Sequence, residues 1–293
     1  MLDTKLYTLL KVAEQGSFTK AADMLGLTQP AVSQHIRALE EEYGVRIFDR
    51  SANRLIITRE GEKVIATARA MRTINNKLKD ELSGIIFGAR DLNIGITHTV
   101  ESSRIAQVLT RYASERNVTI KLISGDQEKL ARRIRSCELD LAIVDGALTD
   151  PQLKHLTLDT DSLVLIVAPE HRFAGRQRVD IDDIKSEKLI LRLPSSGTLS
   201  LFAATVESRG ISMSEFNVIL EVDNVATIKD LVRAGYGVSL LARSACADEL
   251  YKGKLIALPI RDMNMTREIN IIYSKDFQYE SFLKDIVALY AEG

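Results

Sequence analysis

Three glycines, Gly16, Gly26 and Gly44, divide the first part of the chain into short helices. The positions of these glycines constrain the fold more than any other feature of the sequence. Apolar residues recur at helical spacing up to Gly16, which ends the first helix. Ser17 follows as the N-cap of a second helix, which Gly26 ends. Thr28 caps a third helix, which ends at Gly44. The segment is therefore predicted to form three short helices joined by tight turns.

The second and third helices have the layout of a helix-turn-helix. Pro30 lies in the first turn of the third helix, where a missing N–H costs little. The buried stripe of that helix consists of Val32, Ile36 and Leu39. The candidate DNA-reading residues lie at its start: Thr28, Gln29, Pro30, Ala31, Ser33, Gln34 and Arg37. Such side chains suit base edges, although an ordinary helical bundle with a solvated polar face remains the alternative at this point.

A basic hairpin follows the third helix and favours the DNA-reading interpretation. Residues 45–48 and 55–57 are predicted to form short strands around a polar turn. The hairpin contains Arg46, Arg50 and Arg54, which suit phosphate groups or a narrow minor groove. A helix-turn-helix with such a hairpin is a winged helix-turn-helix.

Residues 4–62 resemble, without a gap, the winged helix-turn-helix of LysR-type transcriptional regulators. The resemblance rests on the elements Ser-Phe-x-x-Ala-Ala, Gln-Pro-Ala-Val-Ser and Leu-Glu taken together. It implies that four residues face the major groove: Gln29, Pro30, Ser33 and Gln34. It also implies that a wing arginine enters the minor groove. Many members have this arginine where the chain has Asn53, so Arg50 and Arg54 remain alternatives for that role.

A heptad pattern follows the wing. Thr58 is a good N-cap, and a helix is expected to continue to about Gly84, with Gly61 its one weak position. Side chains at alternating spacings of four and three form a seam, in which one buried Asn can fix the register. The predicted dimerisation residues are Val64, Ala68, Met71, Asn75, Leu78 and Leu82. The seam resembles the linker helix through which LysR-type proteins pair, and a single helix packed on its own domain is the alternative.

Strands alternate with helices over the rest of the chain. The predicted strands are 92–96, 118–123, 139–144, 163–168, 189–191, 216–222, 238–241 and 268–273. Apolar strands between helices predict a parallel sheet covered on both faces. The layout is similar to the two-lobed, periplasmic-binding-protein-like effector domain of LysR-type regulators, with crossovers expected near 160–164 and 264–268.

The predicted fold is α/β overall, in three parts. A winged helix-turn-helix DNA-binding domain takes residues 1–58, a linker and dimerisation helix residues 59–87, and an effector-binding domain residues 88–293. Within the effector domain, lobe I is expected at about 88–162 and 266–293, and lobe II at about 163–265. A length of 293 residues agrees with about two domains plus a linker.

Polar segments follow several predicted strands, where open α/β folds bind ligands. The strongest is Ser195–Thr198, because hydroxyls, a glycine and helix N-terminal amides suit a carboxylate or another small oxyanion. The candidate effector-binding residues are Thr97, Thr99, Ser124, Ser195, Ser196, Gly197, Thr198 and Asn224. A plain capped helix start is the alternative. Arg192 is a candidate countercharge or a surface pair, and His98 is expected to be structural or solvated.

The net charge of −1 at first argues against a nucleic-acid partner. Residues 1–90, however, hold 14 Lys and Arg against 11 Asp and Glu, whereas residues 91–293 hold 25 against 29. The negative excess is thus assigned to the sensing domain. We expect a DNA-binding protein that relies on dimer geometry and base contacts more than on bulk attraction.

No enzymatic motif is found in the sequence. Gly235-Tyr236-Gly237 lacks the third glycine of a dinucleotide fingerprint, and no Gly-x-Ser-x-Gly elbow, phosphate loop or metal-ligand pair is present. Cys137 and Cys246 are too few for a disulfide framework or a thiolate zinc site. They are interpreted as buried small residues rather than a redox switch. We expect no enzymatic activity, no cofactor and no metal.

The sequence thus predicts a LysR-type transcriptional regulator controlled by a small, anionic effector between two lobes. Its expected partners are double-stranded promoter DNA, the effector and further copies of itself, as a dimer or tetramer. It is expected in the cytoplasm, since neither a signal peptide nor a membrane segment is found. The alternative is a cytosolic solute-binding receptor or small enzyme that uses the two-lobed domain. The effector, the target genes and the direction of control stay open.

Overall fold

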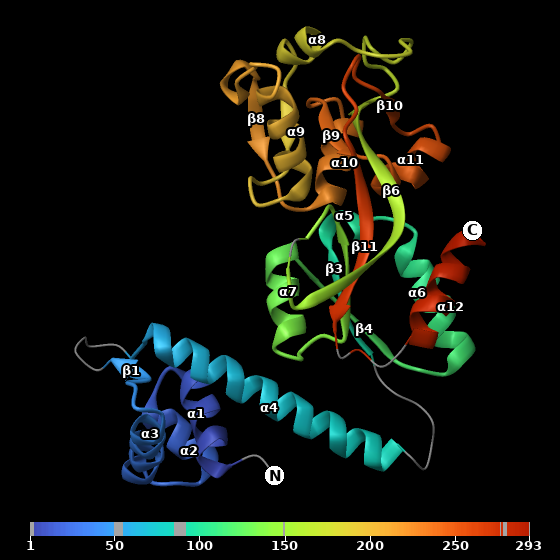
Figure 1. The fold of residues 1–293 in the computed structure, drawn as a ribbon. Helices are drawn as coiled ribbons and strands as arrows, with labels where there is room; N and C mark the ends of the chain where they lie inside the picture. The colour runs from blue at the N-terminus through green and yellow to red at the C-terminus, as the bar shows by residue number, and fades with distance from the viewer. Residues whose placement is uncertain are drawn as a thin grey trace. The chain divides into compact units, whose positions relative to one another are not determined.

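The computed structural model of the chain describes residues 3–49, 55–84, 92–148, 150–275, 277 and 280–292. The chain divides into two compact units, one made mainly of Met1–Arg90 and one of Asp91–Ile134 with Leu139–Gly293 (Figure 1). No helix among the described residues is long and apolar enough to span a bilayer.

The first unit begins with three short helices, as the positions of the glycines predict. They are α1 (Thr4–Gln15), α2 (Phe18–Leu25) and α3 (Gln29–Tyr43). A glycine with a φ of 60° to 64° follows each helix, a left-handed conformation that other residues rarely adopt. The side chains of Ser17 and Thr28 accept hydrogen bonds from the amides of Lys20 and Ala31, each at 3.4 Å. Both predicted N-caps are therefore confirmed.

A small hairpin and a long helix complete the first unit. Strand β1 (Phe48–Asp49) pairs antiparallel with β2 (Ile56–Ile57), and helix α4 spans Arg59–Gly84. Thr58 caps α4, since its hydroxyl accepts a hydrogen bond from the amide of Gly61 at 2.9 Å. The predicted cap and the predicted length of this helix are confirmed.

The first strand of the hairpin begins later than the predicted 45–48. The amide of Ile47 is hydrogen-bonded to a carboxylate of α3 rather than to a partner strand, so strand pairing begins at Phe48. The two candidate groove arginines, Arg50 and Arg54, lie outside the described residues.

The start of α4 packs into the core of the first unit. Ile65 and Ala68 are buried there, Ala68 with only 1% of its surface exposed, and Val64 packs against the same cluster. This placement corrects the predicted seam at its first two positions, because Val64 and Ala68 face the helices of their own chain. Farther along α4, Met71 and Leu78 are exposed.

In the described part of the second unit, one seven-stranded sheet and a separate pair of strands are present. The strands of the large sheet are β3 (Leu92–Thr97), β4 (Ile120–Gly125), β5 (Leu141–Asp145), β6 (Leu153–Val167), β9 (Ser239–Ala242), β10 (Ile256–Leu258) and β11 (Thr266–Ser274). Their order is β10-β6-β11-β5-β3-β4, with β9 also paired to β6. β3 is parallel to β4 and β5, whereas β6 and β11 are antiparallel to their neighbours. The predicted parallel pairing is confirmed for β3, β4 and β5, whereas the sheet as a whole is mixed, because β6 and β11 run antiparallel to their neighbours.

Strand β6 passes from one lobe to the other, and β11 pairs with the part of β6 that lies in lobe I (Figure 1). Up to Ser162, β6 pairs with β11, and from Leu163 onward it pairs with β9 and β10. The predicted crossovers near 160–164 and 264–268 coincide with this change of partners. The strand predicted to start at Leu163 is instead the second part of one continuous strand.

Helices cover both lobes. Lobe I combines β3, β4 and β5 with α5 (His98–Glu101), α6 (Ile105–Arg116), α7 (Gln127–Arg135) and α12 (Glu280–Ala291). Lobe II combines β9, β10 and the parallel pair β7 (Leu189–Leu191) and β8 (Val218–Glu221) with α8 (Ile181–Lys185), α9 (Gly197–Glu207), α10 (Val225–Arg233) and α11 (Ala247–Tyr251). Each lobe has apolar clusters of its own, centred on Ile94 and Ile143 in lobe I and on Leu165 and Phe202 in lobe II.

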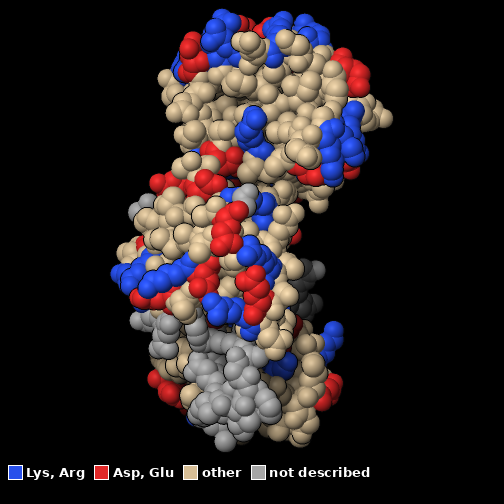
Figure 2. Space-filling view, turned by 90° about the vertical axis from the view of Figure 1, so that its right-hand side faces the viewer, with Lys and Arg blue, Asp and Glu red and all other residues tan. Residues whose placement is uncertain are grey.

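The charged side chains on one side of lobe I are paired. Arg111 of α6 lies 2.8 Å from Glu115 and 2.9 Å from Glu292, and Arg116 lies 2.7 Å from Asp285 of α12. Figure 2 shows basic and acidic side chains interspersed over this lobe. This face therefore presents no uniform basic surface.

Gly95 of β3 generates a prediction about stability. A Cβ at Gly95 would lie 2.8 Å from Ala142 Cβ and Leu139 Cδ1, and 2.9 Å from Leu130 Cδ2. We expect Gly95→Ala to lower the free energy of unfolding by about 1–3 kcal/mol, because these buried atoms must shift. Urea denaturation measures the change, with Gly175→Ala as control, since a Cβ at Gly175 meets nothing within 4 Å. Equal stability of the two variants would contradict the prediction.

Candidate functional site

The predicted DNA-reading residues lie at the beginning of α3. Thr28, Gln29 and Pro30 are exposed, and so are Gln34 and Arg37 one and two turns later. Glutamine and arginine side chains in such positions have the length and the donors and acceptors needed to reach base edges. The exposed start of α3 can therefore read a duplex.

Ser33 and Ala31 are less open than their neighbours. Ser33 is buried, and its hydroxyl accepts a hydrogen bond from Gln29 Nε2 at 3.0 Å, while Ala31 is half-buried. The hydroxyl of Ser33 thus orients the Gln29 side chain. The sequence pattern gives no sign of this contact between Gln29 and Ser33.

The outer face of α4 presents apolar side chains. Met71 is 45% exposed, Leu78 is 53% exposed, and Ile74, which the heptad omits, is 55% exposed. Asn75 is half-buried, and the side chain of Leu82 lies outside the described residues. Large exposed apolar groups in one stripe favour contact with another surface.

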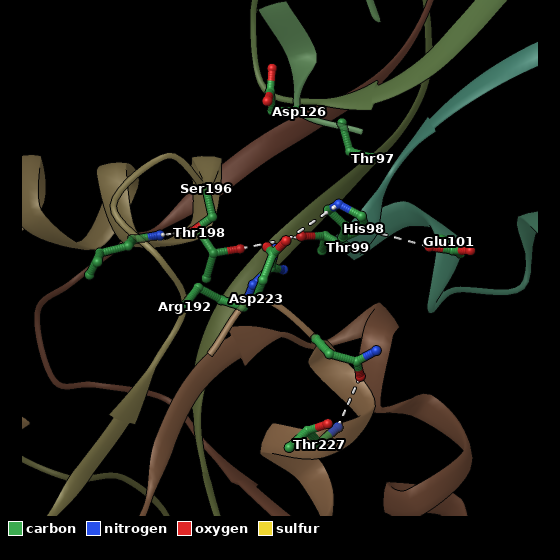
Figure 3. A network of polar contacts seen from close by, with 12 residues as sticks. Thr97, His98, Thr99, Glu101, Asp126, Arg192, Ser196, Thr198, Asp223 and Thr227 are labelled. Carbon is green, nitrogen blue, oxygen red and sulfur yellow. Dashed lines mark hydrogen bonds and ion pairs between the residues drawn. The ribbon is translucent and has the colours of Figure 1, made fainter. Parts of the chain in front are cut away.

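A cavity of about 830 Å³ lies between the two lobes of the second unit. Most of the predicted effector residues line it: Thr97, Thr99, Ser124, Ser195, Ser196 and Gly197. Thr198 is buried and its hydroxyl lies 3.4 Å from that of Thr99, across the lobes. Figure 3 shows Thr97 and Thr99 of lobe I close to Ser196 and Thr198 of lobe II.

Asn224 does not line this cavity. Its side chain accepts a hydrogen bond from the amide of Thr227 at 3.0 Å and so caps α10. The preceding Asp223 lines the cavity instead. The prediction for Asn224 is therefore corrected by one residue, because the helix start uses the Asn side chain as its cap.

Arg192, which directly follows β7, is the most unusual residue of the cavity. Only 3% of its surface is exposed, and its Nη2 donates to Asp223 Oδ1 at 3.0 Å. Its Nε and Nη1 are buried and have no hydrogen-bond partner among the described residues. A buried guanidinium with unused donors needs acceptors, so this side chain can bind an anion that enters the cavity.

A buried ion pair of lobe I lies at the cavity and makes a hydrogen bond to lobe II. Arg267 Nη1 at the start of β11 lies 2.5 Å from Asp145 Oδ2 at the end of β5, and Arg267 Nη2 donates to Thr198 Oγ1 of α9 at 3.2 Å. Thr97 donates a hydrogen bond to the same carboxylate. Sequence reasoning missed both charged residues. The position of Asp145 directly after an apolar strand was a usable signal, but nothing marked Arg267.

His98 and the cysteines play lesser parts. His98 Nε2 lies 3.8 Å from Asp223 Oδ2 and its Nδ1 3.6 Å from Glu101 Oε2, at the rim of the cavity. Burial raises the pKa of the Cys246 thiol to about 12. Because the thiolate is the reactive form, Cys246 is inert near neutral pH, which agrees with its interpretation as a buried small residue.

Two family profiles match the chain. The profile of the bacterial regulatory helix-turn-helix proteins of the lysR family matches residues 4–62, and that of the LysR substrate binding domain matches residues 88–292. The chain belongs to the LysR family of transcriptional regulators. As a LysR-type regulator it binds DNA and a small-molecule effector. A solute-binding receptor or small enzyme is not favoured, because either would leave residues 4–62 without a purpose.

Known LysR-type proteins align with most of the chain. The regulator CbbR of Rhodospirillum rubrum is 30% identical over 266 residues, which cover 89% of this chain and 86% of CbbR. CysL of Bacillus subtilis is 25% identical over 273 residues, 92% of this chain and 90% of CysL. The crystal structure of full-length CbnR with its target DNA matches with a TM-score of 0.71 at 18% identity, and the match covers 98% of both chains. That structure shares the fold of this LysR-type chain.

The exposed Gln34 generates a prediction about base reading. We expect Gln34→Ala to relax the base preference at one position of each half-site, at a cost of about 1–3 kcal/mol, with unchanged stability. Competition binding against single-base variants of a duplex selected from a random library measures this. Ser33→Ala should relax the preference as well, by releasing Gln29. Unchanged preference in both variants would mean that α3 is not the reading helix.

Proposed function

We propose that this LysR-type regulator changes its DNA binding when a small anionic molecule enters the cavity between its lobes. The observation that carries the proposal is the pair of unpartnered, buried guanidinium nitrogens of Arg192. In this proposal residues 1–58 bind DNA, residues 59–87 pair with a second copy of the chain, and residues 88–293 bind the effector. The protein would act on promoter DNA in the cytoplasm and without enzymatic activity.

The surroundings of Arg192 support an anion of modest size. Helix α9 starts at Gly197, on the cavity wall, and the first-turn amides of a helix lack partners within the helix. Ser196 caps α9 through the amide of Leu199, and Ser195 adds a hydroxyl beside it. Donors from β7 and α9 thus face one space, which suits a carboxylate or an oxyanion such as sulfate.

The acidic groups of the cavity limit how much negative charge it accepts. Asp145 is neutralised by Arg267, and Asp126 lies 2.7 Å from Lys129. Asp223 already takes one donor of Arg192. The described lining also includes Glu128 and Arg132, so basic and acidic groups alternate along the wall and no broad positive surface forms. We expect a ligand with a single compact anionic group.

Self-association through α4 is the second element of the proposal. The exposed stripe of Met71, Ile74 and Leu78 lies on the outer part of the helix, beyond the segment buried in its own domain. Covering such a stripe with the same stripe of a second chain removes apolar surface from water. Asn75, half-buried beside it, would fix the register of the two helices.

An effector acts on such an assembly only through a difference in affinity between two arrangements. The cavity is built from both lobes, so an anion held by Arg192 and the α9 amides of lobe II stabilises the lobe arrangement in which Thr97, Thr99 and Ser124 of lobe I also reach it. A changed lobe arrangement then favours one placement of the paired DNA-binding units over another. The direction of control depends on which placement matches the operator.

The role of Arg192 can be tested with sulfate and a series of small carboxylates as probes. We expect at least one of them to raise the melting temperature of the full-length protein, by about 2–4 °C for each kcal/mol of binding free energy. Arg192→Met should abolish this rise, and chloride at equal ionic strength is the control. Asp223 is 54% exposed, so it tolerates the loss of its partner. A rise that persists in Arg192→Met would exclude Arg192 as the anion anchor.

Leu78→Asp tests pairing through α4. A charge in the middle of an apolar helix seam is expected to dissociate the assembly, because the carboxylate would lose its water. Sedimentation velocity should show a shift to smaller species and weaker operator binding. Thr73→Asp is the matched control, since it lies about 140° around the helix from Leu78. A Leu78→Asp protein that sediments like the wild type would refute this mode of pairing.

A further inference from the structure

The peptide at the base of the wing is held from two sides. On one side, Glu40 of the recognition helix α3 accepts hydrogen bonds at Oε1 from the amides of Ile47, at 2.8 Å, and Phe48, at 3.3 Å. On the other side, the carbonyl of Ile47 accepts from the amide of Thr58 at 3.0 Å, and Thr58 Oγ1 donates to the carbonyl of Arg46 at 2.6 Å. Thr58 is the N-cap of α4. One short segment therefore bridges α3 and α4.

Gly61 makes this bridge sterically possible. A Cβ at Gly61 would lie 2.2 Å from the carbonyl oxygen of Ile47 and 2.9 Å from its carbonyl carbon. Both are backbone atoms, so a side chain would force the wing away from α4. The weak position noted in the helix pattern thus has a physical reason, because the first turn of α4 must approach the wing more closely than any other residue allows.

The hairpin cannot hold this position by itself. Among the described residues its ladder has the pairs Phe48–Ile57 and Asp49–Ile56, and a short two-stranded hairpin is marginal in water. Ile56 and Ile57 are both exposed, so the second strand contributes little burial. The wing depends on the contacts at its base, where Ile47 and Phe48 are buried.

We propose that Glu40 and Gly61 are positioning residues for DNA binding, which fix the wing relative to the recognition helix. The wing contributes exposed Arg46 and, in sequence, Arg50 and Arg54, a set of cations suited to phosphates and the minor groove. The distance of Arg46 from the bases read by α3 is set by the Glu40 carboxylate and by the Gly61 contact. The proposal rests on DNA binding by the family and is independent of the effector.

The same contacts join α3, the wing and the first turns of α4 into one body. A displacement of α4 therefore moves the wing with it, because Thr58 and Gly61 contact the base of the wing directly and no flexible loop lies between them. In this arrangement Glu40 is not a repulsive charge near DNA, because its carboxylate is directed to backbone amides. Its neighbour Glu41 is exposed on the same helix and makes none of these contacts.

The experiment uses the full-length protein and a duplex selected by the wild type from a random library. Hydroxyl-radical cleavage reports minor-groove and backbone contacts, and methylation protection of guanine N7 reports the major groove. We expect Glu40→Ala to lose the hydroxyl-radical protection at the edges of each half-site while it keeps the central methylation protection. Its Kd should rise about tenfold, since two charge-assisted hydrogen bonds are lost, and its dependence on salt should weaken.

Three further variants make the result specific. Glu40→Gln keeps an acceptor oxygen and should retain most of the edge protection, whereas Glu41→Ala removes the same charge and should behave as the wild type. Gly61→Ala should reproduce the Glu40→Ala footprint from the other side of the wing. A wild-type footprint in both Glu40→Ala and Gly61→Ala would overturn the proposal. So would a simultaneous loss of both protection patterns and of the helical circular dichroism signal, because Glu40 would then serve only stability.

Discussion

The pairing of β6 with β11 is the interaction on which the sensing unit depends. Strand β6 continues from one lobe into the other, and after Ser162, opposite the start of β11 at Thr266, its partner changes from β11 to β9 and β10. The lobes are thus joined by two adjacent, hydrogen-bonded segments rather than by loose linkers. This geometry keeps the ends of β3 and β5 opposite the start of α9, and the cavity exists because those ends meet there.

The sequence was most informative where local chemistry decides the structure. Some features follow from rules that act within a few residues. They are the N-caps Ser17 and Thr28, the glycines in the left-handed conformation and the length of α4. The sheet was predicted only in part because β6 is half apolar and half polar, and its apolar half alone resembled a new strand. Asn224 caps α10 and lies outside the cavity, whereas Ser196 caps α9 and lines the cavity, and the two cases look the same in sequence.

Long-range contacts set the limits of such reasoning. Arg267 and Asp145 lie 122 positions apart in the chain, and no local pattern pairs them. Ala68 occupied a correct heptad position, but the domain that precedes it in the chain covers that face of the helix. In the same way, Arg192 is a candidate anion-binding residue because two of its buried nitrogens have no hydrogen-bond partner among the described residues. Its type was visible in the sequence, whereas the two unsatisfied nitrogens emerge only when the surrounding side chains are placed.

The ion pair at the cavity has a consequence for the size of the motion that a ligand can cause. Arg267 and Asp145 both belong to lobe I, and almost none of this pair is exposed. Separation of the lobes would therefore leave the ion pair intact and would break only the hydrogen bond from Arg267 to Thr198 of lobe II. A hydrogen bond from a charged donor contributes about 1.5–3 kcal/mol, so the resistance to lobe motion at this point comes from one polar contact rather than from the separation of two buried charges.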